Sequence, residues 1–249
     1  MNDKILEGLY HGDCLEVMKR IPDEYVDMIL CDLPYGITQN KWDVIIPFDK
    51  LWEQYDRVVK KNGAVLLFAA GVFLAKLILS NEKYYKYKIV WHKSKKVGFL
   101  NAKKQPLRQH EDILVFYRKQ PTYNPQFVKG EPYINKSETR TSNYGYFNCV
   151  PRINRTGDRY PVDIISNKDL NKIYDNKRKH PTQKPVPLLE NLIKQYSNEG
   201  DTILDNAMGS GSTGVACMNT NRNFIGIELN KEYYDFAIED IEEARAKCN

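Results

Sequence analysis

The sequence lacks most of the features that mark secreted, metal-stabilised or membrane proteins. It has five widely spaced cysteines and no Cys-x-x-Cys pair, which argues against a zinc ribbon, a thioredoxin-type site or a disulfide framework. The longest apolar run, near Val65–Ala70, is far shorter than the ~20 residues of a membrane span. Met1-Asn2-Asp3-Lys4 carries a charge pair and begins no apolar signal segment. We therefore expect a soluble cytoplasmic protein.

Charge is distributed unevenly, although the overall balance of +5 is modest. Residues 93–180 hold 19 basic and 8 acidic side chains, a net charge of +11, and the remainder of the chain is acidic. This basic middle is either a lysine-rich solvated surface or a face that binds a polyanion. Interleaved aromatic residues, which stack on nucleobases, favour a nucleic acid. They are Phe99, Tyr123, Phe127, Tyr133, Tyr144, Tyr146, Phe147 and Tyr160.

Short apolar, β-branched runs alternate with stretches of helical periodicity, which is typical of an α/β domain with a mostly parallel sheet. Seven strands are expected, at 5–10, 26–31, 64–70, 87–92, 112–117, 202–205 and 223–228. The spacing of apolar residues predicts helices around 51–59, 73–78, 188–196 and 231–247, and Asn62-Gly63 is expected to stop the first of them.

The stretch from about residue 119 to 179 does not follow this alternation. It is rich in Asn, Tyr, Arg, Lys and Pro, and it shows little sustained periodicity. An irregular segment of this length inside a compact domain is usually functional or mobile. We therefore expect residues 1–118 and 180–249 to form one domain, and residues 119–179 to be an insertion that carries specificity.

A glycine-rich turn follows the predicted strand at 202–205. Gly209, Gly211 and Gly214 fit G-x-G-x-x-G at the start of a predicted helix, and Glu228 ends the next strand. Glycines let a ligand approach the backbone and the acid accepts hydrogen bonds from ribose hydroxyls, so an adenosine-containing cofactor is predicted. Alone, the segment does not distinguish a dinucleotide from S-adenosylmethionine, or either from a plain strand–helix turn beside a surface Glu. No G-x-x-x-x-G-K-[ST] sequence occurs, which excludes a P-loop.

A second group of residues follows the predicted strand at 26–31. Asp32, Pro34, Tyr35 and Gly36 stand at its carboxyl end, where open α/β sheets bind ligands, although an ordinary Pro-containing turn has the same composition. One chemistry makes particular use of these residues. The exocyclic amine of a nucleobase is a poor nucleophile because its lone pair is delocalised into the ring. A carboxylate and a backbone carbonyl on the two N–H bonds would localise that lone pair, while Tyr35 stacks on a base flipped out of the duplex.

Together these segments resemble a known family. Asp-Leu-Pro-Tyr at 32–35, with Asp205 and Gly209-Ser210-Gly211-Ser212-Thr213, is similar to the DNA amino-methyltransferases, which transfer methyl from S-adenosylmethionine to adenine N6 or cytosine N4. The catalytic motif comes first and the cofactor motif last, which resembles the beta class and its circularly permuted fold. His180-Pro181-Thr182-Gln183-Lys184-Pro185 resembles the segment that binds the methionine part of the cofactor. The resemblance implies a Rossmann-like methyltransferase fold with a seven-stranded mixed sheet.

Carried over to this chain, the resemblance assigns Asp32, Pro34 and Tyr35 to the target amine. Leu33 replaces the more frequent Pro of the motif, which should preserve the roles of its neighbours. Cytosine-N4 enzymes more often begin this motif with Ser, so the leading Asp favours adenine. Cytosine-C5 methylation is set aside because it needs a covalent thiolate, usually from a Pro-Cys pair, and this chain has none. We expect Cys31 to be a core residue.

The resemblance also implies a set of cofactor-binding residues. Glu228 would bind the ribose, and Thr182 and Lys184 would bind the methionyl carboxylate. Asp13 would accept the adenine amine of the cofactor, although it is almost equally suited to cap the following helix. Asn206-Ala207 stands where Pro-Phe is common, and the missing aromatic ring bears on cofactor affinity. The remaining positions are Cys14, Asp205, Ala207, Gly209, Ser210, Gly211, Ser212 and Thr213.

Basic residues around 98–102 are the expected DNA contacts, and similar sequence occurs near the DNA-facing side of the family. Together they would neutralise several phosphates and make binding sensitive to salt. The loop at 38–43 follows the catalytic motif directly and is expected to close over a flipped base. The four histidines show no spacing typical of a metal site, and none is predicted. The predicted DNA-binding residues are Lys41, Trp42, Lys93, Lys95, Lys96, Lys103, Lys104 and Arg108.

The sequence therefore predicts a site-specific adenine-N6 methyltransferase that uses S-adenosylmethionine on double-stranded DNA. A cytosine-N4 enzyme is the first alternative. Further alternatives are an RNA or protein N-methyltransferase, an NAD-dependent oxidoreductase built on Gly209–Gly214, and a catalytically silent nucleic-acid-binding subunit. The family resemblance also suggests a homodimer and a cognate restriction endonuclease as partners.

Overall fold

The structure is a computed structural model of the chain that describes residues 6–36, 43–135, 152–166, 170 and 183–248. Its contacts divide the chain into two compact units, one formed by residues 1–124 and 163–249 and the other by residues 125–162. The second unit lies within the stretch expected to be an insertion. In the described part of the chain, no helix is long and apolar enough to cross a membrane.

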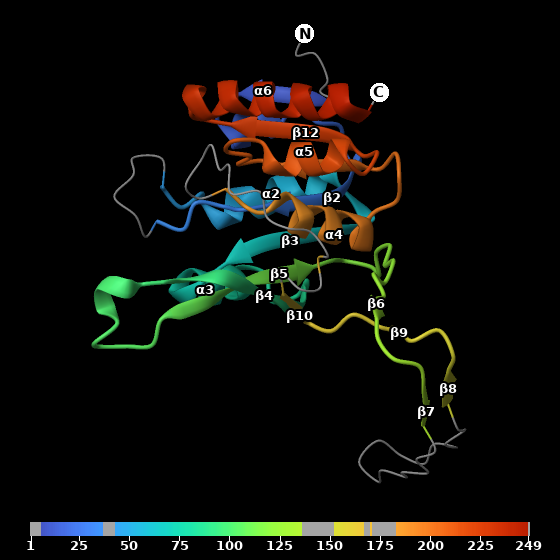
Figure 1. The fold of residues 1–249 in the computed structure, drawn as a ribbon. Helices are drawn as coiled ribbons and strands as arrows, with labels where there is room; N and C mark the ends of the chain where they lie inside the picture. The colour runs from blue at the N-terminus through green and yellow to red at the C-terminus, as the bar shows by residue number, and fades with distance from the viewer. Residues whose placement is uncertain (1–5, 37–42, 136–151, 167–169, 171–182, 249) are drawn as a thin grey trace. The chain divides into compact units, whose positions relative to one another are not determined.

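The first unit is built on an eight-stranded mixed sheet (Figure 1). Its strands are β1 (Gly8–His11), β2 (Val26–Cys31), β3 (Val59–Ala69), β4 (Tyr85–Val97), β5 (Arg108–Phe116), β10 (Ile164–Ser166), β11 (Thr202–Asp205) and β12 (Asn223–Glu228). Their order in the sheet is β1-β12-β11-β2-β3-β5-β4-β10. Strand β5 is antiparallel to β3 and β4, and every other neighbouring pair is parallel.

All seven predicted strands are present, and β10 is an additional eighth strand beside β4. It has only three residues and lies in the stretch that shows no sustained periodicity, so the sequence pattern gave no signal for it. The predicted fold class, a mixed and mostly parallel α/β sheet, is confirmed.

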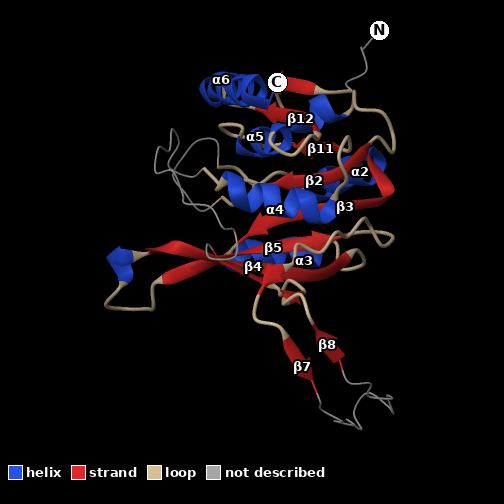
Figure 2. Cartoon of the chain, turned by 45° about the vertical axis from the view of Figure 1, so that its right-hand side comes forward, coloured by secondary structure: helices blue, strands red, loops and turns tan. Residues whose placement is uncertain are grey.

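Helices cover both faces of this sheet (Figure 2). They are α1 (Cys14–Met18), α2 (Phe48–Val58), α3 (Gly71–Ser80), α4 (Val186–Tyr196), α5 (Ser212–Met218) and α6 (Lys231–Cys248), with a 3-10 turn, η1, at Phe99–Asn101. Helices α1–α3 pack on one face and α4–α6 on the other, and each set forms its own core cluster with the strands. Alternate residues of β3 supply both clusters: Val65 and Leu67 face one, Leu66 and Phe68 the other.

One predicted boundary is wrong. Helix α2 passes directly into β3 at Val59, so Asn62-Gly63, expected to stop the helix, lies inside the strand. A Cβ atom on Gly63 would come within 2.7 Å of the carbonyl oxygen of Asp27 on β2. The glycine is therefore needed for close approach of two strands at an irregularity in their register rather than for a turn.

The second unit contains two short antiparallel ribbons. Strand β6 (Val128–Lys129) pairs with β9 (Asp158–Arg159), and β7 (Tyr133–Asn135) pairs with β8 (Arg152–Asn154). The rings of Phe127 and Tyr160 pack with their centroids 5.0 Å apart. Several aromatic and aliphatic side chains of this unit are exposed, among them Tyr133, Ile134 and Ile153.

Candidate active site

The two sequence motifs meet because their strands are neighbours in the sheet. Strand β11 pairs in parallel with β2, Leu204 lying opposite Ile29, and also with β12. The carboxyl ends of all three strands therefore lie at one edge of the sheet. Asp32, Asp205 and Glu228, which come from segments far apart in the sequence, are brought to this edge.

A cavity of about 750 Å³ opens at this edge, a size typical of small-molecule sites. Most of the predicted site residues line it. They are Asp13, Cys14, Asp32, Pro34, Tyr35, Lys184, Asp205, Ala207, Gly209, Ser210, Ser212, Thr213 and Glu228, together with Lys93, Lys95, Lys96 and Arg108 from the predicted DNA contacts.

Three predicted residues that the structure describes do not line the cavity, and three others lie outside the described residues. Gly211 adopts a left-handed conformation (φ 82°) and caps α5, and its α-carbon approaches α6 so closely that a Cβ would lie 2.9 Å from Cβ of Ala237. Lys103 and Lys104 lie farther out on the β4–β5 hairpin. Thr182, Lys41 and Trp42 lie outside the described residues.

The glycine-rich turn is closed by its own acidic residues. The buried Asp205 carboxylate accepts hydrogen bonds from Thr213 Oγ1 at 2.6 Å and from the Ala207 amide at 3.1 Å. Burial raises the pKa of Asp205 to about 6, against the hydrogen bonds that favour its charged form. The Gly209 amide donates to Glu228 Oε2 at 2.9 Å, which ties the turn to the end of β12. Asp205 therefore shapes the turn, and both of its oxygens are engaged in doing so.

Glu228 and Asp13 stand on the side of the cavity where the ribose and adenine of a cofactor are expected. Glu228 is largely buried, its Oε1 accepts from the Asn230 amide at 2.7 Å, and burial raises the pKa of its carboxyl. Asp13 caps α1 by accepting from the Leu15 amide at 2.8 Å, and it also lines the cavity. The capping role anticipated for Asp13 is thus present, and its exposed carboxylate remains accessible to a ligand.

Asn206 replaces the proline common at its position and has a structural role of its own. Its Oδ1 accepts from the Tyr55 hydroxyl of α2 at 2.5 Å, and its Nδ2 donates to Cys14 Sγ of α1 at 3.6 Å. Burial raises the pKa of Cys14 to about 11, so its thiol stays neutral. The substitution joins two helices to the cofactor turn by polar contacts.

Asp32 is held from two sides. The Tyr35 hydroxyl donates to its Oδ1 at 2.9 Å, and Lys184 Nζ forms an ion pair with its Oδ2. The Tyr35 ring stacks on Phe73 with centroids 4.7 Å apart and planes 22° apart. Burial raises the pKa of the Tyr35 hydroxyl well above its usual range, which keeps it a neutral donor. The Asp32 side chain is still 31% exposed, so its carboxylate is accessible from the cavity.

Glu111 is a cavity residue that sequence reasoning did not assign to the site. It lies near the start of β5, and because β5 runs antiparallel to β3, that end of the strand reaches the same edge as the catalytic motif. Its Oε2 is 3.4 Å from Lys184 Nζ, and its Oε1 pairs with Lys93. The signal available in the sequence was an acidic residue directly before a predicted strand.

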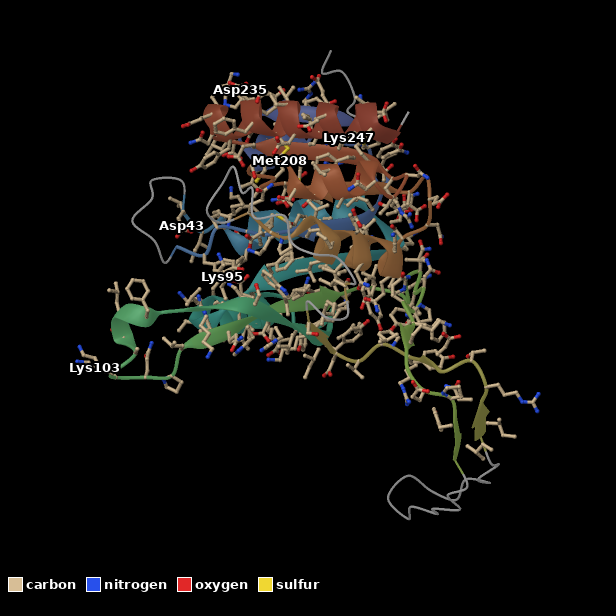
Figure 3. All side chains as sticks on the ribbon, in the orientation of Figure 1. Asp43, Lys95, Lys103, Met208, Asp235 and Lys247 are labelled. Atoms are coloured by element: carbon tan, nitrogen blue, oxygen red, sulfur yellow. The ribbon has the colours of Figure 1, made fainter. Side chains whose placement is uncertain are left out.

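The β4–β5 hairpin carries the remaining predicted DNA contacts. It extends beyond the rest of the sheet, with Lys103 far out on it (Figure 3). Lys95, nearer the sheet, lines the cavity. Phe99 and Leu100 of η1 are 76% and 85% exposed. Beside the catalytic motif, the Gly36 amide donates to Asp43 Oδ1 at 2.8 Å. The loop expected to close over a base lies, apart from Asp43, outside the described residues.

Within the described residues, no group of three or more His, Cys, Asp or Glu side chains is arranged to hold a metal ion.

Comparison with known proteins gives consistent matches along the chain. A family model described as DNA methylase, of the N6/N4 methyltransferase type, matches residues 26–239. The protein named DNA adenine methyltransferase YhdJ from Escherichia coli (strain K12) is 30% identical over 249 residues, covering 95% of this chain and 83% of that protein. The Type II methyltransferase M.HpaI of Haemophilus parainfluenzae is 25% identical, covering 95% of this chain and 74% of its own length.

Solved structures agree. The crystal structure of the M1.HpyAVI–SAM complex has a TM-score of 0.63 at 27% identity, covering 93% of this chain and 98% of its own. The cytosine-N4-specific PvuII DNA methyltransferase has a TM-score of 0.69 at 13% identity, covering 99% of this chain and 93% of its own, a likeness of fold alone. These structures confirm the predicted Rossmann-like fold.

Proposed function

Because this chain belongs to the DNA methylase family of the N6/N4 type, whose model matches residues 26–239, we propose that it transfers a methyl group from S-adenosylmethionine to the N6 amine of adenine in double-stranded DNA. The family and the enzyme class inferred from the sequence are thereby confirmed. An NAD-dependent oxidoreductase is no longer needed to explain the glycine-rich turn, and it leaves the arrangement of Asp32 and Tyr35 without a purpose.

The observation that carries the proposal is one cavity that joins the two motifs. Asp32 and Tyr35 line it together with the glycine-rich turn and Glu228. The residues fit the cofactor: Glu228 offers carboxylate oxygens suited to ribose hydroxyls, and Asp13 offers an acceptor suited to an adenine amine. When bound, S-adenosylmethionine supplies an electrophilic methyl group on its sulfonium.

The residues at the end of β2 account for activation of the target amine. Asp32 accepts a hydrogen bond from one amine N–H, and a local backbone carbonyl accepts from the other, which localises the lone pair on nitrogen. Tyr35 offers its ring to the flipped base while Phe73 supports the ring from behind. Catalysis then consists of positioning and of charge stabilisation.

The choice of adenine rests on two observations. Asp32 leads the catalytic motif, and the relative YhdJ is named an adenine methyltransferase. Cytosine N4 is the alternative, because an enzyme with that specificity shares the fold.

Several finer assignments extend the proposal. The irregular segment 119–179, which contains the second compact unit, reads the DNA sequence through side chains that reach base edges. Lys41, Trp42 and the basic residues of the hairpin contact DNA, and Thr182 contributes to the methionyl end of the cofactor site. A cytoplasmic location, a homodimer and a cognate restriction endonuclease complete the proposed context. The name of M.HpaI as a Type II methyltransferase supports the last of these.

Nucleoside mass spectrometry on DNA incubated with the protein and S-adenosylmethionine tests the proposal. We expect N6-methyladenine from the wild-type protein and none from Asp32→Ala, which should still bind the cofactor in calorimetry. Asp49→Ala, the same change at an exposed position on α2, is the matched control and should behave as wild type.

Each other outcome has a definite meaning. N4-methylcytosine would overturn the base assignment and leave the family intact. Full methylation by Asp32→Ala would overturn the mechanism. Absence of any methylated base on varied DNA, from a protein that binds the cofactor, would point to RNA or to a missing partner.

A further inference from the structure

A chain of alternating charges runs from the base of the β4–β5 hairpin to the catalytic carboxylate. Lys93 on β4 pairs with Glu111 on β5, Glu111 is 3.4 Å from Lys184, and Lys184 pairs with Asp32. Their side chains are between 11% and 31% exposed. Among the described residues, this cluster contains two cations and two carboxylates, so its charges balance.

Lys184 depends on both carboxylates. Burial alone would lower the pKa of its ammonium, but the charges of Asp32 and Glu111 outweigh this effect and raise the pKa above its ordinary value. Its Nζ also lies 4.9 Å from the centroid of the Phe68 ring, a cation–π contact that compensates an ammonium less than a carboxylate does. Removing either carboxylate would leave the buried ammonium with one compensating charge.

Other titratable groups around Asp32 cannot replace this support. The Tyr35 hydroxyl occupies the opposite oxygen of Asp32 as a neutral donor. Asp205 and Cys31 face Asp32 from β11 and β2, and the carboxylate charge of Asp32 contributes to the raised pKa of each. They therefore compete with negative charge at Asp32 rather than compensate it, and Lys184 is the cation in contact with Asp32 among the described residues.

We infer that Glu111 is a positioning residue for methyl transfer, acting through Lys184 to keep the Asp32 carboxylate oriented toward the cavity. The inference rests on the proposed function, and it gives Lys184 a task at the catalytic carboxylate in place of the methionyl carboxylate expected from the sequence. Buried ion pairs contribute little net stability, because desolvation offsets their attraction. The arrangement is therefore better explained by the geometry it imposes on Asp32 than by a contribution to folding.

The test replaces Glu111 with Gln, which keeps the shape of the side chain and removes its charge. The matched control is Asp112→Asn. Asp112 is the next residue of β5, is also buried, and pairs with Lys88 at 2.8 Å, but it does not line the cavity. Both variants are compared with wild type by single-turnover methylation rate, by dissociation constants for cofactor and DNA, and by the pH dependence of the rate.

We expect Glu111→Gln to lower the single-turnover rate by about tenfold or more, with dissociation constants unchanged. Because Lys184 loses one of its two carboxylates, its ammonium deprotonates at lower pH. The alkaline decline of the rate should therefore move down by about one pH unit or more relative to wild type. Asp112→Asn should keep the wild-type rate and pH profile. Glu111→Asp keeps the charge on a shorter side chain. Its alkaline limb should lie close to that of wild type, even if its methylation rate is lower.

Three results would overturn the inference. One is a wild-type rate and profile in Glu111→Gln. Another is an equal loss in Glu111→Gln and Asp112→Asn, which would indicate a merely structural effect. The third is a larger dissociation constant for the cofactor with an unchanged rate, which would indicate that Lys184 binds the cofactor. If Glu111→Gln does not fold, the pH profile of Glu111→Asp tests the inference instead. Because Glu111→Asp keeps the charge, a downward shift of its alkaline limb by about one pH unit relative to wild type would contradict the inference. An inactive wild-type protein would instead count against the proposed function.

Discussion

At the scale of single residues, the site is organised around the two oxygens of Asp32. One accepts from the Tyr35 hydroxyl and the other pairs with Lys184, so the carboxylate is fixed before a base arrives. Pre-organised acceptors of this kind need no reorganisation during the reaction. In the proposed mechanism, Tyr35 thus has two separable tasks, one for its hydroxyl and one for its ring.

Substitutions at Tyr35 separate these tasks. Tyr35→Phe keeps the ring on Phe73 and loses one hydrogen bond to a carboxylate, worth about 1.5 kcal/mol, so the single-turnover methylation rate should fall about tenfold. Tyr35→Ala also removes the stacking surface and should cost at least about tenfold more. Tyr87→Phe removes a hydroxyl that bonds Tyr196 away from the cavity, and it should retain the wild-type rate. A wild-type rate in Tyr35→Phe would show that the bond to Asp32 is dispensable.

Residues within local motifs were predictable, and residues brought in by strand direction were not. Asp32, Tyr35 and the glycine-rich turn each follow a strand whose carboxyl end can be read from the sequence. Glu111 lies near the start of its strand, and it reaches the cavity only because β5 is antiparallel to its neighbours. Strand direction depends on long-range pairing, which apolar periodicity does not encode.

At the scale of elements, the β4–β5 hairpin is the most distinctive feature of the first unit. Its outer part combines exposed Phe99 and Leu100 with several lysines, and it extends beyond the rest of the sheet (Figure 3). Residues at its base line the cavity. Basic residues on such an arm neutralise phosphates without reading sequence.

The double substitution Lys103→Ala/Lys104→Ala tests this role. If each lysine neutralises one phosphate, the slope of log K against log salt concentration should become shallower by about 1.8, equally for all DNA sequences. The control removes two lysines from α6 instead, Lys231→Ala/Lys247→Ala, which are paired with acidic residues on their own helix. Fluorescence anisotropy at several salt concentrations gives both slopes. Equal slopes in wild type and Lys103→Ala/Lys104→Ala would place the hairpin outside the DNA interface.

Elements with a clear apolar pattern could be found from the sequence, whereas β10 and the junction between α2 and β3 could not. The seven predicted strands and the four predicted helices are present, although some ends differ: β3 begins at Val59 and β4 extends to Val97. Strand β10 was missed because three residues carry no pattern, and the boundary between α2 and β3 was misplaced because Asn62-Gly63 favours a turn in isolation. Packing against β2 overrides that local preference, as tertiary contacts often do.

At the scale of the whole molecule, the buried Asp205 carboxyl links stability to pH. Its pKa of about 6 in the folded protein lies above the ordinary value, so the folded state holds a proton that the unfolded state releases between about pH 4 and pH 6. The contribution of this group to the free energy of unfolding therefore falls as pH rises through that window, by an amount on the order of 3 kcal/mol.

Denaturant unfolding of wild type and Asp205→Asn at pH 4 to 7.5 measures this linkage. The amide keeps an acceptor for the Ala207 amide and has no charge to bury. Asp205→Asn should therefore gain stability relative to wild type as pH rises from 4 to 6, and the difference should be constant above about pH 7. A difference independent of pH would show that Asp205 titrates alike in both states.

The sheet order also has a consequence for how the enzyme is made. Strand β1 lies at the edge of the sheet and pairs with β12, more than two hundred residues later in the chain. The sequence separation between β2 and its partner β11 is also large. On the ribosome, the catalytic carboxylate emerges early and stands beside an unpaired strand edge until the cofactor half has been translated. Until then, such an exposed strand edge can bind chaperones or pair with the wrong strand. A nascent chain released before β11 therefore carries Asp32 without the glycine-rich turn and without Glu228, so it lacks the proposed cofactor site.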